Sequence, residues 1–285
     1  MNGYFLLSEL MKRAPLTFET VDDLVAAHVR GRLNRPAQHM LFTPTGIGPL
    51  IELAFESTDG RSGPLLSSVW LDGLGLADLR RALRSTDNMW LDQGRVRGFM
   101  RTVFNPLDAA NDVTRTTFLV GARVAAEKAG LPVRLAQILA AALRELESNI
   151  HEHSERPESG LLAFQASAAG FELVAADSGR GVLETLREAK EFEDLTDHGR
   201  ALHLSLQDNV SRHGHDPNHG NGFKDLFLGL AELNANVRFR SGDHALTISG
   251  ARPDLKAAQL GQKVHFQGLF ASVSCRPVQP IGAHH

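Results

Sequence analysis

The segment from residue 133 to about residue 153 constrains the fold more than any other part of the chain. Its apolar residues recur at helical spacing, so they form one stripe that must be buried against another layer. The stripe residues are Leu135, Ile138, Leu139, Ala142, Leu143, Leu146 and Ile150. Three polar residues, Glu145, Asn149 and His153, follow four apart on an adjoining face. The segment therefore predicts a long helix with a polar row beside the buried core.

Further secondary-structure signals lie on both sides of this helix. Residues 114–128 predict an earlier helix, which Gly130 and Pro132 close. Downstream, the β-like runs 161–166 and 171–176 are separated by a small turn, so they predict a hairpin.

The second run ends in the peptide Asp177-Ser178-Gly179-Arg180-Gly181, which precedes a helix-like stretch over residues 182–186. Its glycines allow a backbone to approach a ligand closely, and its carboxylate is a fixed acceptor at the end of a strand. A plain strand-to-helix turn accounts for most isolated peptides of this kind. Here, however, a second glycine pair follows in Gly220-Asn221-Gly222, before an amphipathic stretch over residues 223–233.

Taken together, the polar row and the two glycine peptides resemble the GHKL ATPase superfamily. This superfamily includes gyrase, a heat-shock chaperone, sensor histidine kinases and mismatch-repair ATPases. Residues 145–154 resemble its N box, residues 177–181 its G1 box and residues 220–222 its G2 box. Phe223 stands where leucine is more usual. The resemblance covers about residues 115–275 and is strongest to the anti-sigma or serine-kinase type and to the kinase catalytic domain. It implies an α+β fold, a two-layer α/β sandwich with an antiparallel or mixed sheet.

The resemblance also implies a site for ATP or ADP with Mg²⁺. Asp177 would accept a hydrogen bond from the adenine amino group, Gly179 and Gly181 would let the base pack closely, and Asn149 would ligate the metal. One amide oxygen is an adequate protein ligand, because Mg²⁺ keeps several waters and takes phosphate oxygens. Glu145 occupies the place of the general base; its alternative is a solvated carboxylate on a helix surface. The further nucleotide-binding residues implied are His153, Gly220, Asn221 and Gly222.

The segment from about residue 195 to residue 219 is expected to be a mobile lid between the two glycine peptides. Its end is rich in turn residues and offers little apolar area to offset the entropy of ordering. It also contains a cluster that superficially suggests zinc, made of His213, His215, Asp216 and His219. Structural zinc sites use rigid ligand sets rich in cysteine, so a lid is the favoured interpretation.

Residues 1–112 lie outside the resemblance and predict a separate mixed α/β domain of unknown function. The segment 20–33 predicts a helix, and residues 78–83 look helical. Between them lie short apolar runs, at 50–55 and 65–71.

Residues 113–278 are expected to form the ATP-binding domain. After the second glycine peptide, the runs 236–239 and 245–248 around residues 241–243 predict a hairpin. Residues 264–274 predict a final strand. No transducer domain is expected after this strand, so DNA strand passage and motor or chaperone activity are not favoured.

Composition narrows the partners and the location. The net charge of -3 gives no strong basic footprint, so no nucleic-acid partner is expected. No apolar run approaches the length of a membrane span, and no signal peptide is visible, so we expect no membrane association. The single cysteine, Cys275, fits a reducing cytoplasm.

Three functions stay open for this sequence. The chain is expected to bind an adenine nucleotide and a protein partner, with a homodimer among its options. It would then phosphorylate a serine or threonine of that partner, act as a nucleotide-gated interaction module with little turnover, or simply hydrolyse ATP. Autophosphorylation on His151 is not expected, because this histidine lies inside the N box rather than on a separate upstream helix.

Overall fold

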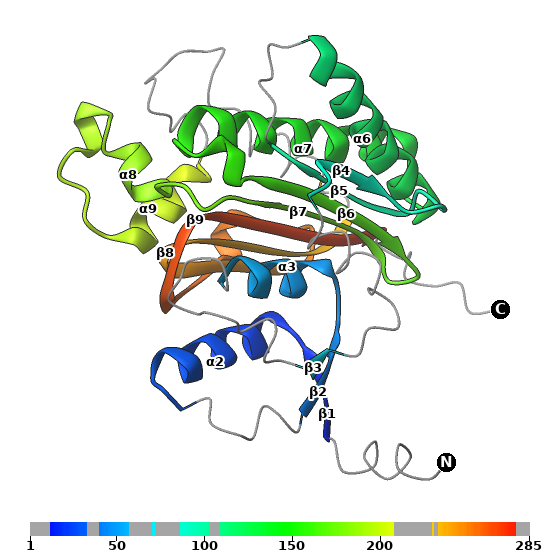
Figure 1. Ribbon diagram of the computed structural model, residues 1–285. Helices are drawn as coiled ribbons and strands as arrows, with labels where there is room; N and C mark the ends of the chain where they lie inside the picture. The colour runs from blue at the N-terminus through cyan, green and yellow to red at the C-terminus, as the bar shows by residue number, and fades with distance from the viewer. Residues whose placement is uncertain are drawn as a thin grey trace. The chain divides into compact units, whose positions relative to one another are not determined.

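The described residues form a mixed α+β architecture (Figure 1). The computed structural model describes residues 12–32, 40–56, 70–71, 86–102, 109–207, 230 and 233–277. The chain divides into two compact units, Met1–Thr86 and Asp87–His285. This division precedes the expected boundary at residues 112 and 113, because the strands β4 and β5 pair with the sheet of the second unit.

The first unit contains a parallel sheet of three strands in the order β1-β2-β3. The strands span Lys12–Leu16 (β1), Met40–Pro44 (β2) and Trp70–Leu71 (β3). Helix α2 (Phe18–Val29) follows β1, and helix α3 (Ile47–Glu56) follows β2. Parallel neighbours require crossover connections, so this unit has the alternating β and α order of an α/β arrangement.

Both strands and helices are present in the described part of this unit. Helix α2 begins two residues before the expected helix at 20–33 and is capped by the Thr17 side chain, which accepts a hydrogen bond from the Thr20 amide. The apolar run 50–55 lies inside α3. The expected helix at 78–83 falls outside the described residues.

The second unit is built on one antiparallel sheet of six strands in the order β4-β5-β6-β7-β9-β8. The strands span Met89–Leu91 (β4), Arg97–Arg101 (β5), Leu161–Ser167 (β6), Gly170–Ala176 (β7), Leu233–Ala251 (β8) and Gln259–Pro277 (β9). Strands β6 and β7 form the expected hairpin. Strand β9, which follows all the other described strands in sequence, lies between β7 and β8.

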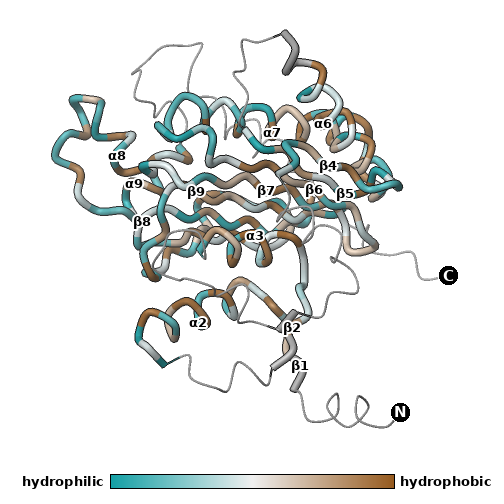
Figure 2. Tube along the Cα trace, viewed as in Figure 1, coloured by the Kyte–Doolittle hydropathy of each residue, from teal (hydrophilic) through white to brown (hydrophobic). Residues whose placement is uncertain are grey.

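Two long helices, α6 (Ala109–Lys128) and α7 (Val133–His153), lie across one face of this sheet (Figure 1). The expected stripe of α7 is buried except for Ile138, which is partly buried against the same core. Phe118 of α6 packs against Phe164 of β6, with ring centroids 5.3 Å apart. Figure 2 shows hydrophilic and hydrophobic residues alternating along both helices. The helix pattern read from the sequence thus corresponds to a real layer of the core.

Strand β8 corrects one expectation. Residues 241–243 were expected to reverse the chain, but β8 continues through them and remains paired with β9. Gly242 has a φ of +59°, and the pairing shifts register on both sides of it, so the peptide forms a bulge. The reversal comes later, through the 3-10 turn Leu255–Ala257 between the two strands. A glycine inside a strand pattern can mark a bulge or a turn, and the local sequence does not distinguish the two.

None of the helices in the described ranges is long and apolar enough to cross a membrane.

Candidate functional site

Asp177 lies directly after β7, and its side chain is 3% exposed. Its Oδ1 accepts a hydrogen bond of 2.8 Å from the Gly179 amide. Its own amide donates to the carbonyl of Leu269 on β9 at 2.9 Å. Burial raises the pKa of the Asp177 carboxyl to about 6, although backbone hydrogen bonds from Gly179 and Leu269 act in the opposite direction. A buried, rigidly held carboxyl therefore stands at the carboxyl end of β7.

Both glycines of the peptide 177–181 are required, for different reasons. A Cβ on Gly179 would lie 2.2 Å from the carbonyl oxygen of Ser154, at the end of α7. Gly181 has a φ of +86°, which side chains disfavour, and it precedes the short helix α8 (Val182–Leu186). The first glycine allows close approach to α7, and the second allows the chain to turn into α8.

Arg180 joins this loop to the end of α7. Its Nε donates to the carbonyl of His153 at 2.9 Å, and its backbone amide donates to the carbonyl of Ser154 at 3.0 Å. The last carbonyls of a helix have no partner within the helix, so these bonds satisfy them. The guanidinium also pairs with Glu155 at 3.1 Å and with Glu188 at 2.6 Å. The loop and the helix terminus therefore form one hydrogen-bonded unit.

The three polar residues expected to face the nucleotide share one side of α7 and are all half-buried. The structure brings His153 to the loop directly, through its main-chain carbonyl. Asn149 and Glu145 lie one and two helical turns further back, at about 6 and 12 Å along the helix axis. The second glycine peptide, Gly220-Asn221-Gly222, lies outside the described residues. The described residues of the expected site therefore lie on α7 and on the loop after β7, which meet at the end of the helix.

The described part of the expected lid is folded, which corrects the expectation that the whole segment rests unfolded. Residues 198–205 form helix α9 (His198–Ser205), capped by Asp197. Leu195 and Ala201 pack with Leu183 and Leu186 of α8 in a small apolar cluster. The burial of these apolar residues offsets the entropy of ordering this part of the segment. The histidines at 213, 215 and 219 fall outside the described residues.

Two residues that the sequence analysis did not single out lie beside the loop that carries Asp177. Gly268 of β9 has a φ of +89°, and a Cβ there would lie 2.7 Å from Oδ1 of Asp177. Ser241 of β8 donates from its hydroxyl to the carbonyl of Gly268 at 2.8 Å. The signal for Gly268 was available, because an isolated glycine inside a strand pattern indicates a bulge or a close backbone approach.

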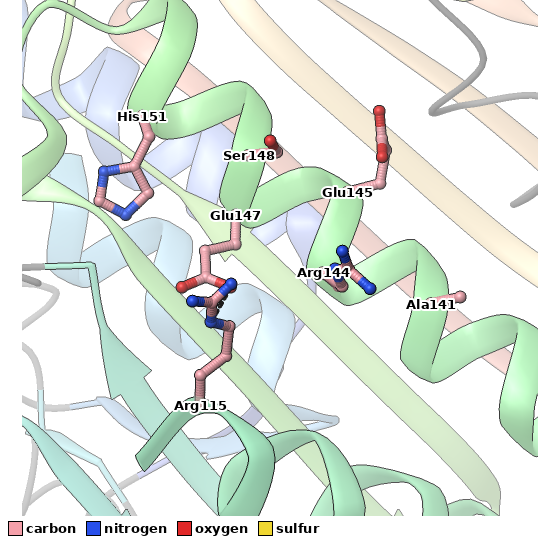
Figure 3. A pocket seen from close by; sticks show the side chains of 7 residues that line it. All are labelled: Arg115, Ala141, Arg144, Glu145, Glu147, Ser148 and His151. Carbon is pink, nitrogen blue, oxygen red and sulfur yellow. Dashed lines mark ion pairs between the residues drawn. The ribbon is translucent and has the colours of Figure 1, made fainter. Parts of the chain in front are cut away.

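A second feature, a polar hollow of about 250 Å³, lies between α6 and α7 (Figure 3). Glu147 faces Arg115 there at 3.8 Å, and Glu145 points away from this pair. Burial raises the pKa of Glu147, while burial and the nearby Arg115 lower the pKa of His151. The other residues that line the hollow are Ala141, Arg144 and Ser148. It shares Glu145 with the expected site but lacks Asn149, so we treat it as a separate feature.

Within the described ranges, no group of three or more His, Cys, Asp or Glu side chains is arranged to hold a metal ion. Neither a family model, nor a curated protein, nor a solved structure matches this chain.

Proposed function

We propose that the second unit binds an adenine nucleotide together with Mg²⁺. The observation that carries this proposal is the buried carboxyl of Asp177. Among the described residues no cationic side chain pairs with it, and burial makes its charged form costly. The Asp177 carboxylate is an acceptor whose charged form is costly to bury, and it is fixed at the end of a strand beside two close-packed glycines. Such a group fits recognition of a hydrogen-bond donor such as the adenine amino group.

The arrangement of layers supports the same proposal. An antiparallel sheet carries two long helices on one face, and the second helix, which carries the polar row, ends against the loop after β7. We take this as the two-layer sandwich of the histidine kinase-like ATPases, with the first unit as a separate regulatory or partner-binding domain. A cytoplasmic location is part of the proposal. Burial raises the pKa of Cys275, the only cysteine in the sequence, to about 12, so this residue remains a thiol.

The residues present fit the nucleotide and its metal. The carboxylate of Asp177 offers more acceptor positions than its backbone partners fill. Asn149 supplies one amide oxygen on the half-buried side of α7, which suits a cation that keeps most of its waters. Magnesium would supply charge neutralisation at the phosphates. Asn149 would hold it, and Glu145, one turn away, would orient or deprotonate an attacking water or hydroxyl.

Replacement of Asn149 by alanine tests the metal part of this proposal. The variant should lose the magnesium-dependent part of its ATP affinity, because the amide oxygen is removed while the core stripe is untouched. Thermal unfolding with ATP, at several magnesium concentrations, measures this. Ser148→Ala is the matched control, since Ser148 is on the same helix and its hydroxyl bonds to Glu152 at 2.9 Å. An unchanged magnesium response in Asn149→Ala would place the metal elsewhere.

Incubation with labelled ATP separates the three candidate activities, and replacement of Glu145 by glutamine tests this residue as the general base. Incubation with magnesium and γ-labelled ATP should give labelled serine or threonine on a partner protein for a kinase, and free phosphate for an ATPase. In either case Glu145→Gln should reduce the rate about 100-fold and leave nucleotide affinity unchanged, since only the base is lost. A nucleotide-gated module would bind ATP with neither product. Normal turnover by the variant would exclude Glu145 as the base.

A further inference from the structure

Ser241 is a buried polar residue at the point where β8 and β9 leave register. Its side chain is 2% exposed, and the pairing of the two strands shifts immediately after it. Its hydroxyl donates to the carbonyl of Gly268 at 2.8 Å and accepts from the amide of Val182 at 2.9 Å. Both hydrogen-bonding roles of the hydroxyl are therefore used.

These two bonds join the segments on either side of Asp177. Val182 is the first residue of α8, so its amide has no partner within the helix, and Ser241 supplies one from another strand. Gly268 lies against the backbone and the carboxyl of Asp177, with no space for a Cβ. A Cβ on Gly181 would lie 2.9 Å from Oγ of Ser241, so a side chain at this position would crowd the hydroxyl. One hydroxyl thus fixes the distance between the start of α8 and the backbone that supports Asp177.

We propose that Ser241 is a positioning residue for adenine recognition, acting through Val182 and Gly268 on the loop that carries Asp177. This inference rests on the proposed nucleotide binding. If the hydroxyl is lost, Gly268 and the start of α8 can separate, and the carboxyl of Asp177 loses its fixed direction. Binding through the phosphates does not depend on that direction, so the loss should fall on discrimination between bases.

The test compares ADP and GDP affinities, by calorimetric titration with magnesium, for wild type and Ser241→Ala. Ser241→Ala should weaken ADP binding about five- to tenfold and reduce the ratio of ADP to GDP affinity by the same factor. Val182→Pro is the second variant, because proline removes the amide that Ser241 accepts from and puts a ring carbon in its place, which separates the Ser241 hydroxyl from the start of α8. It should reduce the same ratio. Ser249→Ala, an exposed serine on the same strand, should behave as wild type.

Two outcomes would overturn the inference, and they are distinguishable. If wild type binds neither nucleotide, the proposed function fails and the role of Ser241 with it. If wild type prefers ADP and both Ser241→Ala and Val182→Pro keep the wild-type ratio, nucleotide binding stands and only the positioning role is excluded. Should Ser241→Ala fail to fold, the ratio measured for Val182→Pro decides between these results.

Discussion

Replacing Asp177 by asparagine is expected to make the folded protein more stable at pH 8 and, at the same time, a poorer binder of adenine nucleotides. Burial holds the pKa of this carboxyl at about 6 rather than 3.8. Between these two values the folded state binds more protons than the unfolded state, so wild-type stability falls as pH rises through this window. Asparagine does not titrate, so the variant avoids this loss.

The pH dependence gives the prediction its sign and its size. The difference between 3.8 and about 6 corresponds to about 3 kcal/mol, fully expressed above pH 7 and absent below about pH 4. Urea unfolding at pH 4 and at pH 8 measures it. The control is Asp254→Asn, because exposed Asp254 makes the same turn, accepting from the amide two residues on, at 3.0 Å. Equal gains at both pH values would show that charge burial is not the cause.

The loss of affinity has a separate origin. An amide presents one acceptor oxygen where the carboxylate presents two, and it lacks the charge that strengthens a bond to the adenine amino group. Affinity for ADP should therefore fall about 10- to 100-fold at pH 8. Stability and affinity would then change in opposite directions, as expected of a group retained for binding. Wild-type ADP affinity in Asp177→Asn would exclude this residue from the site.

Replacing Gly179 by alanine should cause the second large effect, a loss of about 2 to 4 kcal/mol in the free energy of unfolding. The added methyl would lie 2.2 Å from the carbonyl oxygen and 2.6 Å from Cβ of Ser154, so backbone has to move. The bonds from Arg180 to the end of α7 would lengthen with that movement. Chemical denaturation measures the loss.

Gly261→Ala is the matched control for this substitution. Gly261 lies on β9, and the atom nearest to a methyl added there would be the flexible end of Lys263, at 3.7 Å. That variant should be within about 0.5 kcal/mol of wild type. If Gly179→Ala is equally well tolerated, then the loop after β7 does not pack against α7 as closely as the structure shows.

Local periodicity was enough to predict the helices and the hairpin that frame the site. The helix at 133–153 and the hairpin β6–β7 were predicted because their apolar spacing is set by neighbours in sequence. Strands β4 and β5 were not predicted as part of this sheet, because short strands take their partners from distant residues. For the same reason the bulge at Gly242 was mistaken for a turn.

In the candidate site, too, features set by neighbouring residues could be predicted and features set by strand pairing could not. The peptide 177–181 and its position after a strand could be predicted, since the glycines and the strand are adjacent in sequence. The support given by Gly268 and Ser241 could not, because it depends on how β9 pairs with both β7 and β8. The polar row on α7 was predicted from the sequence, but the burial of Glu147 beside Arg115 was not.

The position of β9 has a consequence for how the protein is made. The strand is synthesised after every other described strand, yet it lies in the interior of the sheet, between β7 and β8. Until it emerges from the ribosome, β7 has an open edge and Asp177 lacks its contacts with Leu269 and Gly268. Pairings this distant in sequence close slowly, because loop entropy is lost before the contacts form. Competence to bind a ligand at Asp177 would therefore appear only when β9 enters the sheet, and a nascent chain ending before β9 would not have it.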